Sequence, residues 1–580
     1  MDCLYFFLPT EGQEYKLARV VSLYIAALPY FKYTSPVLQR NSSMAAIQED
    51  CSGGETRTTF HPTLWGDYFL KYKPQSSAQQ AHMRERMEIL LEQVRTEMKE
   101  ANEIPQILEL VITIERLGLG YHYENEIAQL LDVVFKSDYD DNNLHLVSLR
   151  FYLLRKNRYD VSSDVFHKFE DKQGGFVHSD TNSLLSLYNA AHLSIKGEDV
   201  FDMAFSFTRR HLLGALENLE SAFAGEVSSS LLTPPFRRVG ILEARNYLSC
   251  YTNKVTRNEA ILELAKLNFN ILQLHFCEEL KDVTMWWNKI KMKSRLSFVR
   301  DRIVETYFWI NGTSYNLEYS YSRIIATKVT AFMTIIDDIF DTYSSTEDSM
   351  QLAEAINRWD EDAVNMLPEY MKDIYLYLLE TFHSFEDHLG PKNSYRVVYL
   401  KEAFKKLVQA YSDELKWRDE NYVPKTLNEH LQVSSVSIGT SVVACAIFVG
   451  MDDTTVETLN WVSSDQKLLK SFAIYTRFTN DMASTKREQA GGHCASTIQS
   501  YMKEHGTTND DACEKIKKLI ENSWKDMLHH YLALTDQPMV VPQMILNLSR
   551  TVDNMYKHTD AYTNSEILED TIRMLFAEPM

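Results

Sequence analysis

The stretch from Thr327 to Thr342 reads TKVTAFMTIIDDIFDT, a long apolar helical run that ends in three aspartates. Four-residue spacing puts Asp337 and Asp341 on one face of the predicted helix. No Lys or Arg occurs from residue 329 to residue 348, so the aspartates have no helical salt-bridge partner. Like charges this close raise each other's pKa unless a cation neutralises them. Oxygen ligands without a nearby His or Cys favour Mg²⁺ or Mn²⁺ over Zn²⁺. The stretch therefore predicts a hard-metal site, with a solvated helix end as the alternative.

A second polar cluster lies about 140 residues later in the chain. Asn480, Ser484 and Glu488 are spaced four residues apart, so an amide, a hydroxyl and a carboxylate share one helical stripe. Arg477 lies one turn earlier on the same side. Taken alone, an ordinary polar helix face is the simpler explanation. Together with the aspartates, the stripe is interpreted as the opposite wall of a multi-metal site.

The overall charge limits which ligands the chain can bind. The 80 acidic residues outnumber the 60 Lys and Arg, and the formal charge of -20 argues against nucleic acid and anionic membrane surfaces as partners. An anionic ligand would need a local set of cations. Arg300 and Arg302, which flank Asp301, either pair with surface acids or project toward both acidic walls. In the second case they supply the fork-shaped donors that suit a diphosphate.

The apolar pattern predicts an all-α fold. Apolar residues recur at three- and four-residue intervals almost everywhere after Trp65, without sustained alternation and with few Gly or Pro breaks. No tandem repeat supports a solenoid. The best break is the segment from Leu231 to Tyr251, which contains Pro234 and Pro235. We therefore expect an N-terminal arm over residues 1–59, a helical domain over 60–255 and a second helical domain over 256–580.

The N-terminal arm does not have the composition of a targeting segment. It is acidic and poor in hydroxyl residues, and its apolar stretches are short and poorly placed for a secretory signal. Met44 is a candidate functional start. The seven cysteines form no CxxC pair and are odd in number, which predicts reduced thiols in a cytosolic compartment. The uncharged segment from Val433 to Met451 is interrupted at Gly439, so we expect a buried, broken helix rather than a membrane span.

These motifs resemble the plant terpene synthase family, and the likeness covers nearly the whole chain from Trp65. DDIFD at 337–341 resembles the aspartate-rich motif of that family, and NDMASTKRE at 480–488 resembles its second metal motif. RDR at 300–302 and Arg477 match its diphosphate-binding arginines. Further similar stretches are WGDYFL from Trp65, IERLGLGYHYENEI from Ile114, LRFYLLR from Leu149 and KWRDENYVP from Lys416.

The resemblance implies a class I catalytic domain of α-helices behind a catalytically silent N-terminal α-barrel domain. It implies three Mg²⁺ ions, or Mn²⁺ in their place, with Asp338 supporting their ligands. The implied metal ligands are Asp337, Asp341, Asn480, Ser484 and Glu488; the diphosphate would be gripped by Arg300, Arg302 and Arg477. Trp309 and Tyr562 would line the substrate pocket, and the stretch from Tyr556 to Tyr562 would belong to a lid loop.

Two departures from the family pattern bear on the substrate and the reaction. Glu55 and Thr56 stand where the family often has an Arg pair ahead of Trp65. The stretch Asp138-Tyr139-Asp140-Asp141 fits the DxDD pattern of cyclases that protonate their substrates, but the chain has no room for their additional domain. We expect that stretch to be a polar loop without a catalytic role.

The resemblance implies a carbon–oxygen lyase that ionises farnesyl diphosphate and releases sesquiterpenes, and we expect it to be monomeric and cytosolic. In the family it resembles, enzymes that act on geranyl diphosphate usually have a transit peptide and the Arg pair, so the lack of both here favours farnesyl diphosphate over the geranyl diphosphate of a monoterpene synthase. A chain-elongating prenyltransferase normally has two Asp-rich motifs, and a non-catalytic helical scaffold would leave the aspartate cluster unexplained. These three alternatives remain open on sequence grounds.

Overall fold

The computed structural model describes residues 61–580 except 139–141, 172–174, 178–179, 295–297 and 491–494. Within these residues the chain is helical, without strands, and one isolated antiparallel bridge pairs Glu170 with Phe176. The predicted all-α fold is confirmed. The proposals for residues 1–59, for Met44 and for Asp140 and Asp141 lie outside the described residues, while Asp138 is exposed.

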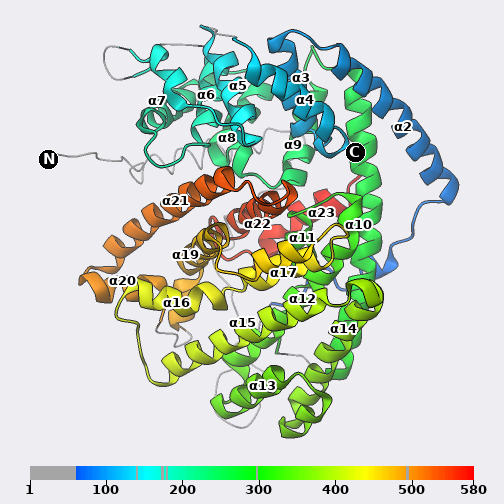
Figure 1. Cartoon of the computed structure of the whole chain (residues 1–580), viewed down its shortest axis with the longest axis vertical. Helices are drawn as coiled ribbons and strands as arrows, with labels where there is room; N and C mark the ends of the chain where they lie inside the picture. Colours follow the sequence, from blue (N-terminus) through cyan, green and yellow to red (C-terminus); the bar gives the residue numbers. More distant parts are fainter. Residues whose placement is uncertain (1–60, 139–141, 172–174, 178–179, 295–297, 491–494) are drawn as a thin grey trace.

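The helices form two groups along the chain, one at the top of Figure 1 and one below it. The first group contains η2 (Phe69–Lys71), α2 (Ser77–Glu100), α3 (Ile104–Arg116), η3 (Gly120–His122), α4 (Glu124–Lys136), α5 (Leu144–Lys156), η4 (Ser163–Phe169), α6 (Thr181–Ala191), α7 (Asp199–Ala215), η5 (Leu216–Asn218), α8 (Ser221–Leu232), η6 (Pro235–Arg237) and α9 (Gly240–Thr252).

The second group begins with α10 (Glu259–Ser294), α11 (Ile303–Asn311), η7 (Leu317–Tyr319), α12 (Ser320–Asp338), η8 (Ile339–Tyr343), α13 (Thr346–Arg358), η9 (Glu361–Met366), α14 (Glu369–Asn393) and α15 (Arg396–Asp419). It continues with α16 (Leu427–Ser437), α17 (Thr440–Val449), α18 (Val456–Val462), α19 (Lys467–Ala490), α20 (Thr497–His505), α21 (Asn509–Ala533), α22 (Val540–Tyr556), η10 (Ser565–Leu568) and α23 (Glu569–Phe576).

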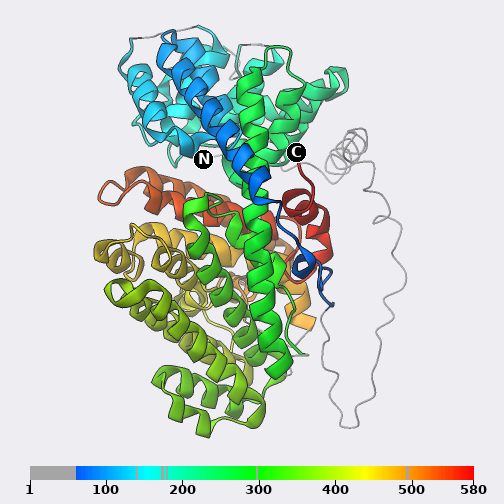
Figure 2. The same cartoon turned by 90° about the vertical axis from the view of Figure 1, so that its right-hand side faces the viewer.

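Helix α10 connects the two groups. Its 36 residues span about 54 Å at the usual rise of an α-helix, and it runs beside both groups in Figures 1 and 2. The predicted boundary at residue 255 falls in the turn between α9 and α10. The division into two domains stays a prediction.

Charged contacts also fasten the two groups together. Arg237 of η6 forms hydrogen bonds of 2.9 and 2.5 Å with the Glu521 carboxylate of α21 and lies 4.5 Å from the centre of the Trp524 ring. Arg550 of α22 donates to the Phe236 carbonyl at 2.7 Å. These contacts join the first group of helices to α21 and α22, which lie next to α19.

The apolar stretch that resembled a membrane span is a broken helix in the core. Leu427–Val449 is long and apolar enough to cross a membrane by length and composition, and 61% of its most apolar window is buried. Gly439 separates α16 from α17 with a φ of 75°, a conformation that favours glycine. The expectation of a buried, interrupted helix is therefore confirmed. The cysteines at 250, 277, 445 and 513 are free, which agrees with the predicted reduced thiols.

Helix α17 packs unusually close to α12, the helix that carries the aspartates. A Cβ atom on Gly450 would lie 2.5 Å from the Cα and 2.9 Å from the backbone nitrogen of Ser322. Ser322 in turn donates its hydroxyl to the Ile447 carbonyl at 2.7 Å. This backbone contact fixes the height of α12 against α17 and thereby the position of the aspartate cluster.

We predict that Gly450→Ala destabilises the protein by about 1–3 kcal/mol, because backbone atoms have to move to admit the methyl group. Thermal or denaturant unfolding measures the change. Gly214→Ala in α7 is the matched control: nothing lies within 4 Å of its added Cβ, so stability should stay equal or rise by about 0.5–1 kcal/mol. Equal stability of the two variants would contradict the close-packing argument.

Candidate active site

The three aspartates occupy the end of α12 and a π turn that follows it. The α-helix ends at Asp338, and η8 continues as a π turn over Ile339–Tyr343, so Asp341 lies in the wider turn. Asp337 is partly exposed and Asp341 exposed, whereas Asp338 is buried. Asp337 and Asp341 are thus the accessible carboxylates of the motif. Arg418 of α15 donates to the carbonyls of Phe340 and Asp341 at 2.8 and 3.0 Å and completes this helix end.

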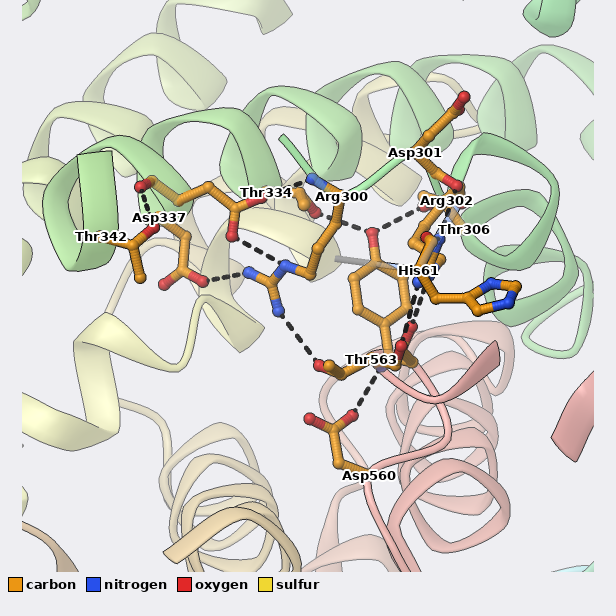
Figure 3. A network of polar contacts seen from close by, with 12 residues as sticks. His61, Arg300, Asp301, Arg302, Thr306, Thr334, Asp337, Thr342, Asp560 and Thr563 are labelled. Carbon is orange, nitrogen blue, oxygen red and sulfur yellow. Dashed lines mark hydrogen bonds and ion pairs between the residues drawn. The ribbon is translucent and has the colours of Figure 1, made fainter. Parts of the chain in front are cut away.

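Arg300, in the loop before α11, provides the positive charge that α12 lacks near its aspartates. Its Nη2 donates to Asp337 Oδ2 at 2.5 Å, its Nε lies 2.8 Å from Asp338 Oδ1, and its backbone nitrogen donates to Asp338 Oδ2 at 2.8 Å (Figure 3). Burial raises the pKa of the Asp338 carboxyl to about 6, against the opposing effect of Arg300. Asp338 therefore acts on the cluster by holding Arg300 rather than by facing solvent.

The second wall lies on α19. Ser484 is buried and donates its hydroxyl to the Asn480 carbonyl at 2.9 Å, one turn earlier. Glu488 lies on the same helix, but its side chain is outside the described residues. Arg477 donates to the Ser434 carbonyl at 3.0 Å, to the Ser437 hydroxyl at 2.9 Å and to Asp481 at 3.1 Å. Its guanidinium is thus held in place from α16 and from its own helix.

The pKa of one buried tyrosine depends on charges from both α12 and α19. Burial raises the pKa of Tyr411 on α15 well above its ordinary value, the carboxylates of Asp337 and Asp341 raise it further, and Arg477 opposes them. Charges on α12 and on α19 thus both act on the Tyr411 phenol. The juxtaposition of the aspartate cluster with the α19 stripe stays a prediction.

Aromatic side chains lie close to the arginine that serves the aspartates. The rings of Trp309 and Tyr562 meet edge to face at 5.8 Å, and Tyr556 meets Trp309 in the same way at 5.7 Å. The Arg300 guanidinium lies 5.7 Å from the centre of the Tyr562 ring. The Tyr562 hydroxyl is bonded to the hydroxyls of Thr306 and Thr334, at 2.9 and 2.7 Å. The structure thus brings Trp309, Tyr562 and Arg300 together.

Arg302 lies in the same loop but points elsewhere. Its guanidinium donates to the carbonyls of Tyr562, Thr563 and His61 at 3.1, 3.0 and 2.9 Å (Figure 3). Among the described residues, no hydrogen bond or ion pair joins it to a side chain of either acidic wall. Its predicted role as a diphosphate ligand stays a prediction.

Sequence reasoning missed the buried group that supports Arg477. Asp481 accepts the backbone N–H of Thr497 at 2.7 Å and lies 3.6 Å from His430 Nε2, in addition to its contact with Arg477. Although burial opposes the shift, Arg477 and His430 hold the pKa of Asp481 well below its usual range. Asp481 follows Asn480 directly, so its place in the motif was visible, but its partners at 430 and 497 were not.

The donor set fits a hard divalent cation. Among the described residues, no three His, Cys, Asp or Glu side chains gather closely enough to form a metal site by themselves. The candidate ligands are carboxylates on α12 and η8 and the amide and hydroxyl on α19, all oxygen ligands, and of these the Ser484 hydroxyl is buried. Mg²⁺ commonly keeps waters and substrate phosphate oxygens beside a few protein carboxylates, so a sparse set of oxygen ligands suits it.

Comparison with known proteins decides the family. Residues 64–231 match the description "Terpene synthase, N-terminal domain", and residues 288–526 match "Terpene synthase family, metal binding domain". A beta-sesquiphellandrene synthase from Sorghum bicolor is 58% identical over 531 residues, which cover 91% of this chain and 97% of the relative. The chain belongs to the terpene synthase family. Members of this family are lyases that use divalent metal, and the resemblance drawn from the motifs is confirmed.

Two other similar proteins help to interpret this terpene synthase. "Inactive sesquithujene synthase B" from Zea mays is 56% identical over 555 residues, covering 94% of this chain and 99% of that relative. An isoprene synthase from grey poplar leaves was solved with three Mg²⁺ ions and dimethylallyl-S-thiolodiphosphate; it is 28% identical, with a TM-score of 0.77 over 86% of this chain and 97% of its own. The inactive maize relative shows that sequence identity at this level does not by itself decide activity.

We predict that Asp481→Asn lowers the free energy of unfolding by about 3 kcal/mol or more, because it leaves the Arg477 guanidinium without its buried counter-charge. The shift of the thermal unfolding midpoint measures the effect. Asp465→Asn is the control: its carboxylate is 83% exposed and lies 3.7 Å from Lys470, so the change should stay within about 0.5 kcal/mol. If both variants unfold like the wild type, Asp481 does not anchor this wall.

Proposed function

We propose that this terpene synthase ionises farnesyl diphosphate and converts the resulting carbocation into sesquiterpenes, with release of diphosphate. The observation that carries the proposal is the pair of accessible aspartates at the end of α12, held by Arg300, in a chain that is 58% identical to a beta-sesquiphellandrene synthase. The monomeric state and the cytosolic location stay predictions.

Five side chains would hold the metal ions, three Mg²⁺ by analogy with the isoprene synthase complex, or Mn²⁺ in their place. They are Asp337, Asp341, Asn480, Ser484 and Glu488. When bound, such ions stabilise the negative charge that develops on the diphosphate as its C–O bond breaks. No residue of this chain needs to act as a covalent nucleophile.

Arg300 and Arg477 would bind the diphosphate from opposite walls. Arg302, the third cation that the sequence predicts for this task, donates to main-chain carbonyls instead. Arg300 holds Asp338 through its Nε and its backbone nitrogen, so the Nη2 now on Asp337 can be given to a phosphate oxygen without loss of position. Arg477 is fixed through its Nε on the Ser434 carbonyl. Preorganised guanidinium groups stabilise developing charge with little reorganisation.

The carbocation has to be kept from water until it cyclises or loses a proton. Trp309 and Tyr562 would shield it, and the face of each ring would stabilise it by about 0.5–2 kcal/mol. The hydrogen bonds of the Tyr562 hydroxyl to Thr306 and Thr334 direct that polar group into the protein. The ring, and not the hydroxyl, is then the part available to the cation.

Two alternatives use the same metal chemistry. A monoterpene synthase would act on geranyl diphosphate, and a chain-elongating prenyltransferase would require isopentenyl diphosphate as a second substrate. The second is disfavoured because the α19 motif offers an amide, a hydroxyl and one carboxylate rather than a second Asp-rich set.

We predict that Asp337→Ala lowers kcat/KM for farnesyl diphosphate about a hundredfold or more, since it removes several kcal/mol of charge stabilisation. Diphosphate release in the presence of Mg²⁺ measures turnover, and circular dichroism should show an unchanged helix content. Asp362→Ala, an exposed acid outside the site, is the control with wild-type turnover. Wild-type turnover of Asp337→Ala would exclude the metal assignment.

We further predict that kcat/KM for farnesyl diphosphate exceeds that for geranyl diphosphate at least tenfold, about 1.4 kcal/mol in transition-state binding. Gas chromatography with mass spectrometry identifies the products. A tenfold preference for the ten-carbon substrate would reverse the assignment.

A further inference from the structure

Arg302 is among the most deeply buried cations of the protein, at 1% exposure. Within the part of the chain that the structure describes, its hydrogen bonds all go to main-chain carbonyl oxygens. Nε donates to Tyr562 at 3.1 Å, Nη2 to Thr563 at 3.0 Å, and Nη1 to both His61 and Asp301 at 2.9 and 3.0 Å. One guanidinium therefore connects the loop before α11 with the loop after α22 and with the chain just ahead of Trp65.

The shape of this side chain matters here more than its charge. Within the described residues no carboxylate forms an ion pair with Arg302. The nearby acid Glu305 is fully buried, and burial raises its pKa to about 7. A planar guanidinium can bond separate carbonyls on several sides at once, whereas a Lys ammonium on a flexible stem is a point charge without that fork.

The loop that Arg302 holds by its carbonyls presents its side chains to the active site. Thr563 accepts a hydrogen bond of 3.5 Å from Arg300 Nη1, and the Tyr562 ring meets Trp309. The loop is closed on itself, because the Thr563 amide donates to Asp560 Oδ1 at 3.0 Å. Arg300 thus contacts the Thr563 side chain, and Arg302 contacts the main-chain carbonyls of the same loop (Figure 3).

We propose that Arg302 is a positioning residue: it fastens the Asp560–Thr563 loop and the chain at His61 together as a cover beside the catalytic arginine, and does not itself bind the diphosphate. This inference rests on the proposed function, because the loop covers a catalytic site only if the substrate binds beside it. A loop held in this way excludes water and sets the position of Tyr562.

Amide hydrogen exchange and diphosphate binding test the proposal without requiring turnover. We compare wild type, Arg302→Gln and Arg302→Lys, with Arg300→Gln as the matched variant two residues away. The reporting amides are Ala561, Thr563 and Asn564, which donate to the Met555 carbonyl, the Asp560 carboxylate and the Asp560 carbonyl. The Thr497 amide, bonded to Asp481, is the internal reference.

Loss of hydrogen bonds from a charged donor should speed exchange of the three reporting amides about tenfold or more in both Arg302 variants, with Thr497 unchanged. Binding of inorganic diphosphate with Mg²⁺ should weaken less than about threefold in the Arg302 variants and more than about tenfold in Arg300→Gln. With farnesyl diphosphate, the Arg302 variants should form more water-quenched alcohol relative to hydrocarbon.

Two results would overturn the proposal. A loss of diphosphate affinity in Arg302→Gln equal to that in Arg300→Gln would make Arg302 a direct ligand. Wild-type exchange rates of the three reporting amides in Arg302→Lys would show that a positive charge alone is enough to hold the loop. Failure of the proposed function is distinguishable, because it would appear as wild-type protein without turnover on any prenyl diphosphate, while the exchange and binding results would still decide what Arg302 does.

Discussion

The site depends on one buried electrostatic contact, the pairing of Arg300 with Asp337 and Asp338. Two carboxylates side by side at a helix end repel each other and oppose the helix dipole. Arg300 reaches both with its guanidinium and adds its backbone N–H, so the cluster is neutralised from a loop rather than from its own helix. The loop, α12 and the π turn are thereby positioned relative to one another before any metal or substrate arrives.

The acidic composition of the chain makes such local cations necessary. With a net charge of -20, the molecule as a whole repels a diphosphate. Arg300 on one side and Arg477 on the other are each fixed by buried carboxylates, Asp338 and Asp481. A fixed guanidinium has already lost its conformational freedom, so it can act on an incoming anion at little further cost. This explains why two carboxylates of the metal motifs are turned away from solvent.

Local pattern predicted much of this arrangement, and tertiary pairing accounts for the rest. The three- and four-residue periodicity predicted the helices, and Gly439 in an uncharged run predicted a broken core helix. The motif offered three aspartates, and the two that the spacing selected, Asp337 and Asp341, are the accessible ones. Sequence could not assign Asp338 to Arg300, or Asp481 to Thr497, because these partners are distant in the chain and carry no pattern of their own. The π turn at η8 was also hidden, since its residues read as ordinary helix formers.

The triplet Arg300-Asp301-Arg302 shows how adjacent residues come to serve different partners. Arg300 binds the aspartates of α12, while Asp301 accepts from the indole of Trp287 at 2.7 Å and from Lys291 at 2.5 Å, both on α10. Arg302 binds the carbonyls of the loop after α22. Because Asp301 bonds the triplet to α10, the backbone of both arginines is fixed. Only their side chains then have to adopt a conformation to reach their partners. A shift of this backbone would therefore move Arg300, with the aspartates of α12, and Arg302, with the loop after α22, together. The position of that loop over the site is thereby coupled to the position of Arg300, the cation proposed to bind the diphosphate.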